Sequence, residues 1–123
     1  MTDQEGTSVE IVEIYVPRRL DYLSRLYGWL KEEIDKPPFG ALLRGFSLYE
    51  VSGAYAGGSL YTEQTIVVRL IFDVEKHIDR ERVSHEQRVN EIADSVVDIT
   101  QNQEEEVWLI RIPAIKTKRQ RRA

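Results

Sequence analysis

Cysteine is absent from the 123-residue chain, which excludes disulfide bonds and thiolate metal sites. No apolar run approaches the roughly 20 residues that a membrane-spanning helix needs, so no membrane partner is expected. The first eight residues, MTDQEGTS, are polar and acidic, unlike a signal or transit peptide. These absences predict a cytoplasmic protein that depends on an ordinary hydrophobic core for its stability.

Positive charge is scarce outside one short segment at the C-terminus. Five of the 17 basic residues lie there with no acid among them: Lys116, Lys118, Arg119, Arg121 and Arg122. The rest of the chain has 12 basic against 21 acidic residues, a net charge of −9. A dedicated nucleic-acid-binding domain usually spreads positive charge over a folded face. Contact with nucleic acid or another acidic partner is therefore predicted for this tail alone.

The longest stretch with strand character runs from Leu60 to Val74, LYTEQTIVVRLIFDV. From Ile66 onward one side of this extended chain is continuously apolar, which is typical of a strand inside a sheet. Three further strands are predicted at residues 9–16, 46–55 and 107–112, the last with Trp108, Ile110 and Ile112 on one face. Pro113 marks either the end of this last strand or a position on a sheet edge.

Two segments have the apolar spacing of amphipathic helices. The first spans residues 20–36 and ends at Pro37-Pro38, because proline cannot continue a helix. The second begins at Ser84, where S-x-x-Q matches a capping box. The order β-α-β-β-α-β predicts an α+β, ferredoxin-like fold with a four-stranded antiparallel sheet and both helices on one face. We expect a single domain over residues 9–115, with disordered ends at 1–8 and 116–123.

Two helices leave the second face of such a sheet uncovered. The strand patterns place five apolar side chains there: Val9, Ile11, Tyr15, Val67 and Ile71. A monomer seldom leaves such a patch in water, so we expect a homo-oligomer, either a dimer or a trimer.

Two segments, SGAYAGGSLYTEQTIVVRLIF and EEEVWLIRIPAIK, resemble the small trimeric ferredoxin-like proteins of the CutA and PII-like group. The resemblance implies a long hairpin between the second and third strands and a trimeric assembly. The chain departs from this group in two respects. It lacks the thiol that CutA-like proteins tend to carry, and its hairpin is too short for the nucleotide-binding loop of PII proteins.

The hairpin around Gly57-Gly58 concentrates aromatic and acidic residues. Tyr55, Tyr61 and Glu63 could bind a small ligand at a subunit boundary, or they could be cross-strand pairs that stabilise the hairpin. Arg44, beside Gly45, could bind an anion or could be a solvated loop residue.

Catalytic and metal-binding signatures are weak. His77, Glu81 and His85 have i, i+4, i+8 spacing, but the capping box at Ser84 starts the helix after Glu81 and separates them. We therefore predict no metal site and no cofactor. Nucleophile elbow, P-loop and dinucleotide motifs are absent.

The pattern as a whole favours a self-associating regulatory or binding module, with a small-ligand site near residues 53–64. One alternative is an accessory protein that contacts nucleic acid or an acidic partner through its basic tail. The other is an enzyme of the dimeric α/β-barrel type using His77, Tyr55 or Glu63 as acid or base.

Overall fold

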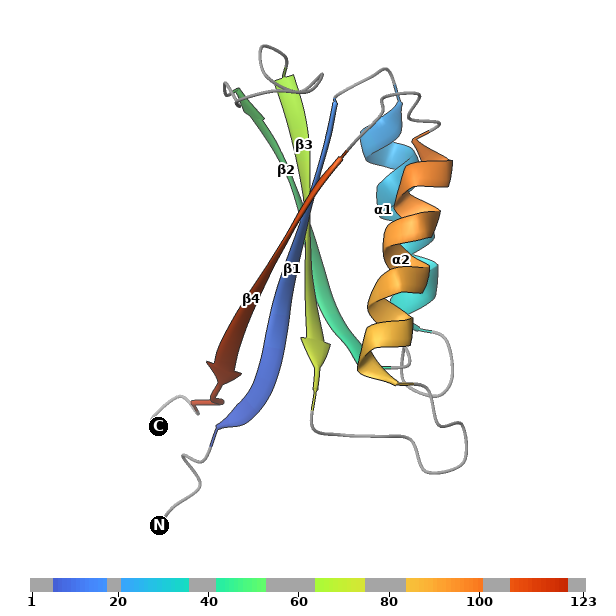
Figure 1. Cartoon of the computed structure of the whole chain (residues 1–123). Coiled ribbons are helices and arrows are strands. Elements are labelled where there is room, and N and C mark those ends of the chain that lie inside the picture. Colours follow the sequence, from blue (N-terminus) through green and yellow to red (C-terminus); the bar gives the residue numbers. More distant parts are fainter. Residues whose placement is uncertain are drawn as a thin grey trace.

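The computed structural model describes residues 6–17, 21–35, 42–52, 64–74, 84–100 and 107–119. Its elements follow in the order β1 (Thr7–Pro17), α1 (Tyr22–Ile34), β2 (Leu43–Ser52), β3 (Gln64–Asp73), α2 (His85–Ile99) and β4 (Trp108–Lys116). The strands form one antiparallel sheet in the order β2-β3-β1-β4. Both helices lie on the same face of it (Figure 1). The predicted ferredoxin-like architecture is confirmed.

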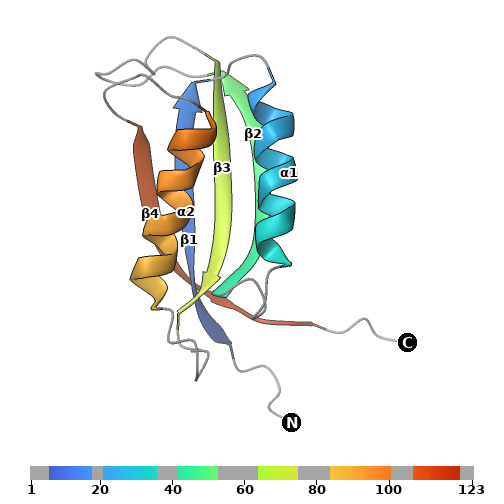
Figure 2. The ribbon, with the colours of Figure 1, turned by 90° about the vertical axis from the view of Figure 1, so that its right-hand side faces the viewer.

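The hydrophobic core lies between the sheet and the two helices, which run side by side across it (Figure 2). The two central strands supply alternate residues to it, as the sequence pattern predicts. Val12, Ile14 and Val16 of β1 and Ile66, Val68, Leu70 and Phe72 of β3 are all at most 1% exposed. The apolar stripes of α1 and α2 close the core with Leu26 and Leu30, and with Val89, Ile92 and Val96.

Helix α2 begins as its capping sequence predicts. The backbone N–H of Gln87 donates a hydrogen bond of 3.1 Å to Ser84 Oγ. This bond satisfies one of the amides that a helix start leaves without an intrahelical partner. At the other end, the hydroxyl of Thr100 donates to the carbonyl oxygen of Val96 over 2.9 Å, and Thr100 is fully buried.

Several strand boundaries differ from the predictions, most of them by one or two residues. β1 begins at Thr7, and β2 begins at Leu43 rather than Phe46, because a β-bulge between Leu43 and Gly45 lets the strand continue through Arg44. β4 continues beyond Ile112 to Lys116, so of the two expectations for Pro113 the edge position is the correct one. Proline is tolerated there because β4 is an edge strand, whose outer side needs no amide donor.

A buried ion pair joins the two helices. Arg88 Nη1 of α2 lies 3.1 Å from Glu33 Oε1 of α1, and the two side chains are 7% and 6% exposed. Arg88 also lies 3.7 Å from Glu91, one turn along its own helix, whose side chain is largely exposed. Both charged groups are almost completely removed from water, so the loss of either one is expected to destabilise the fold strongly.

Candidate functional site

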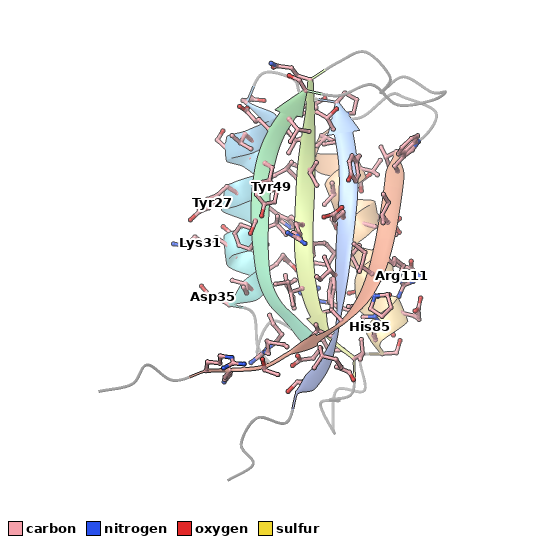
Figure 3. All side chains as sticks on the ribbon, turned by 90° about the vertical axis from the view of Figure 1, so that its left-hand side faces the viewer. Tyr27, Lys31, Asp35, Tyr49, His85 and Arg111 are labelled. Carbon is pink, nitrogen blue, oxygen red and sulfur yellow. The ribbon has the colours of Figure 1, made fainter. Side chains whose placement is uncertain are left out.

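No described helix covers the second face of the sheet, which is seen directly in Figure 3. We call this surface the open face. Strand register and alternation assign its members as Val9, Ile11, Glu13 and Tyr15 of β1, Gly45, Ser47, Tyr49 and Val51 of β2, Thr65, Val67, Arg69, Ile71 and Asp73 of β3, and Trp108, Ile110, Ile112 and Ala114 of β4. Four of these residues are nevertheless at most 8% exposed: Val9, Thr65, Val67 and Asp73.

Most of the open face is apolar. Ile71, Ile11 and Ile112 lie opposite one another on three adjacent strands. Ile110 and Ile112 are each 38% exposed. Because β4 pairs with β1, its apolar residues extend the predicted patch by a further strand. The sequence places Trp108, Ile110 and Ile112 on one side of their strand, but only the register with β1 shows that this side is the open face.

A small polar network lies in the middle of the open face. Arg69 Nε lies 3.5 Å from Glu13 Oε2 on the neighbouring strand. The hydroxyl of Tyr15 donates a hydrogen bond of 3.1 Å to the other oxygen of Glu13. Hydrogen bonding to the Arg69 guanidinium, with a smaller contribution from Ser47, lowers the pKa of the Tyr49 phenol below its usual value. The centre of the face is therefore polar but neutral in net charge.

Arg44, predicted as an anion-binding residue, has an internal carboxylate partner. Its Nε lies 3.4 Å from Asp73 Oδ2, and the Asp73 side chain is 12% exposed. Any external anion would have to compete with Asp73 for this guanidinium. The other oxygen of Asp73 is buried and has no hydrogen-bond partner within the described part of the chain.

The predicted ligand-binding residues of the hairpin, Tyr55, Tyr61 and Glu63, lie outside the described residues, as do His77 and Glu81. Of the tail, Lys116 is the last residue of β4, and Lys118 and Arg119 follow it without regular structure. Arg121 and Arg122 lie outside the described residues.

A second polar group, which we call the edge cluster, consists of Glu10, His85, Glu86 and Arg111. Arg111 pairs with the core residue Val12, which places it on the helix side of the sheet, and His85 and Glu86 lie in the first turn of α2. Figure 3 shows Arg111 and His85 beside each other next to β4. Arg111 donates from Nε and Nη2 to the two oxygens of Glu10, over 2.9 and 2.6 Å. It also donates from Nη1 and Nη2 to the two oxygens of Glu86, over 2.9 and 2.6 Å.

His85 completes the edge cluster. Its Nε2 lies 2.6 Å from Glu10 Oε1, and its ring meets Phe72 edge-on at 5.8 Å between centroids. Spacing along the chain pointed to His85 only as a metal ligand, and it singled out neither Glu10 nor Arg111. A usable signal was present, since Glu10 lies on the same side of its strand as the buried Val12 and Ile14.

The edge cluster should make stability depend on pH. Burial alone would raise the pKa of Glu10, but hydrogen bonds from Arg111 and His85 outweigh this effect and hold the pKa below the ordinary value of a glutamate. A depressed carboxylate pKa contributes stability that is present above the unfolded pKa and is lost as the pH falls through the folded value. Glu10→Gln should therefore lower the free energy of unfolding by about 1.5–3 kcal/mol at pH 7 and by much less at pH 3.

Urea unfolding of the native protein and of this variant at both pH values measures the effect. An equal loss at pH 7 and pH 3 would contradict the assignment, because Glu10 would then contribute by packing rather than by charge.

Several classes of site find no support within the described ranges. No group of three or more histidine, aspartate or glutamate residues there is placed to hold a metal ion. The described helices are too short or too polar to cross a lipid bilayer. Comparison of the chain with models of protein families, with curated proteins and with solved structures gave no match.

Proposed function

We propose that the protein is a self-associating binding module in which the open face of one copy packs against the open face of a second. The observation that carries this proposal is the exposure of Ile110, Ile112 and Tyr49, of which Tyr49 is 43% exposed. All three lie on the open face, and both described helices lie on the opposite face of the sheet. Exposed apolar patches rimmed by polar residues mark interaction surfaces.

The size of the open face suits a stable interface. Four strands about 4.8 Å apart and about 30 Å long cover a flat area of roughly 570 Å². The side chains that project from the sheet make the actual surface area larger. Two such faces in contact bury roughly 1,100 Å² or more in total, close to the range of specific protein interfaces, ~1,200–2,000 Å².

The charges of the open face are also self-complementary. Arg69 and Glu13 lie side by side near its centre, on the two central strands. An isologous two-fold interface brings the same patch of both copies together. Arg69 of one copy can then approach Glu13 of the other, so that each charge has a partner after water has been excluded.

Light scattering on full-length protein free of nucleic acid tests this proposal directly. A mass twice that of the chain is the expected result. A trimer would support self-association and the resemblance to CutA and PII-like proteins. It would contradict the packing of two open faces against each other. A monomer at all concentrations would overturn the proposal.

The ligand of such a module is proposed to bind at the subunit boundary near residues 53–64, as the sequence suggests. Support comes from the composition of this segment, with Tyr55, Tyr61 and Glu63 close together in the chain. Tyr55→Ala should remove ligand binding and leave the melting temperature unchanged.

The basic tail is the basis of the second candidate function, contact with nucleic acid or an acidic partner. Lys116 pairs with Thr7 inside the sheet, so a deletion that spares the fold begins at residue 117. If the tail makes the contact, a chain ending at Lys116 will not bind duplex DNA, and binding by the full chain will weaken steeply with salt. Equal binding of labelled DNA by both chains in an anisotropy titration would rule the tail out.

A further inference from the structure

A cleft of about 480 Å³ opens beside the edge cluster. Glu10, His85, Glu86 and Arg111 line its charged side. Its other side is mainly apolar and includes Val9, Val74, Pro113 and Ile115. Small-molecule sites have volumes of this order and combine apolar walls with a few convergent polar groups.

Arg111 is bound differently on its two sides. Glu10 holds the inner side through Nε and Nη2 and is only 15% exposed. Glu86 holds the outer side, through Nη1 and Nη2, but its side chain is 65% exposed. Exposed ion pairs contribute little to stability, so Glu86 can leave Arg111 at a small energetic cost, whereas Glu10 cannot.

We propose that this cleft binds a small-molecule carboxylate, which takes the place of Glu86 on the outer side of Arg111. The two outer N–H groups of the guanidinium already hold a carboxylate in a two-point arrangement, the geometry that arginine provides for such groups. The apolar body of the ligand would lie against Val74, Pro113 and Ile115.

The charge of the edge cluster selects a monoanion over a phosphate dianion. Two carboxylates, those of Glu10 and Glu86, surround the single guanidinium of Arg111. A carboxylate that replaces Glu86 leaves the number of charges around Arg111 unchanged, whereas a dianion adds one more negative charge near Glu10.

This inference does not rest on the proposed self-association. Glu10 and Arg111 lie on the helix side of β1 and β4, and the open face lies on the other side. Failure of either proposal leaves the other standing.

Isovalerate is a suitable probe, because it combines a carboxylate with a short branched apolar body, and isovaleramide is its neutral counterpart. His85 reports binding, since its Nε2 lies 3.4 Å from Arg111 Nη2. The chain has two histidines, so a His77→Gln background leaves one imidazole signal to follow by NMR. The titration is repeated with Glu86→Gln and with Glu91→Gln, a matched control that removes the same charge from an exposed position of α2.

We expect isovalerate to shift the His85 signal to saturation, and Glu86→Gln to bind it about two- to five-fold more tightly because the internal competitor is gone. Glu91→Gln should bind like the parent chain, and isovaleramide should not bind. Arg111→Lys keeps the charge but loses the two-point geometry, so it should bind isovalerate much more weakly in protein that NMR shows to be folded.

Three results would overturn the proposal. The first is the absence of a saturable shift even in Glu86→Gln. The second is equal affinity of the parent chain and Glu86→Gln, which would show that Glu86 does not compete with the ligand. The third is tighter binding of inorganic phosphate or isovaleramide than of isovalerate, which would contradict the carboxylate assignment.

Discussion

Ile110→Glu is expected to convert the protein into a monomer. Ile110 lies on the open face, where the β4 register places it opposite Glu13. In the proposed interface, the new carboxylate would be buried close to Glu13 without a cation of its own, and an unpaired buried charge opposes association by several kcal/mol. Sedimentation or light scattering should show at least a hundred-fold weaker self-association, which corresponds to about 2.8 kcal/mol.

The neighbouring residue supplies a matched control for this variant. Leu109 is 39% exposed, almost the same as Ile110, but lies on the opposite face of the same strand. Leu109→Glu makes a similar change of size and charge without placing it on the open face, so it should leave the oligomer intact. If both variants dissociate equally, or neither does, then the open face is not the interface.

Glu33→Ala is expected to have the largest effect on stability. The substitution leaves the buried guanidinium of Arg88, 7% exposed, without the carboxylate 3.1 Å away. Removing one partner of a buried ion pair typically lowers the free energy of unfolding by about 3–5 kcal/mol. Urea or thermal unfolding at pH 7 measures this loss, and Glu91→Ala, which removes the exposed second partner of Arg88, should stay within about 0.5 kcal/mol of the native protein.

A double variant separates charge from packing. Glu33→Leu combined with Arg88→Met replaces both charges by apolar side chains, and such replacements are often neutral or even stabilising. The double variant should therefore be clearly more stable than Glu33→Ala. If the double variant is as unstable as Glu33→Ala, then the loss of stability comes from changed packing and not from the lost charge interaction.

Local patterns were enough to predict the architecture. Alternating apolar residues from Ile66 to Phe72 identified the central strand, and the core there is fully buried as the pattern requires. Ser84 and Gln87 identified the start of α2, because capping chemistry operates over three residues. These signals are local, so a single sequence contains them in full.

Features that depend on pairing were harder to predict. Arg44 and Gly45 interrupt the alternation of apolar and polar residues at the start of β2. Only the β-bulge explains how the strand includes them. Pro113 indicates a strand end unless the strand is known to lie at a sheet edge. In each case the missing information was the neighbouring strand.

Glu10 could have been singled out from its side of the strand, but its partners in the edge cluster could not be predicted, for the same reason. Arg111 lies 101 positions from Glu10, and His85 lies 75 positions from it. The sheet order and the docking of α2 bring the three side chains together, and no spacing along the chain encodes that. The same holds for the open face, whose β4 members could be assigned only through the register with β1.

Pro113 also bears on how far any assembly of this protein can grow. Unpaired sheet edges are templates on which further chains add, and repeated addition leads to fibres. A proline within β4 removes one backbone donor from that edge and makes it a poor template. Of the two edges of the described sheet, β4 is therefore the less favourable one for strand addition, and β2 is the edge from which a further chain could extend the sheet.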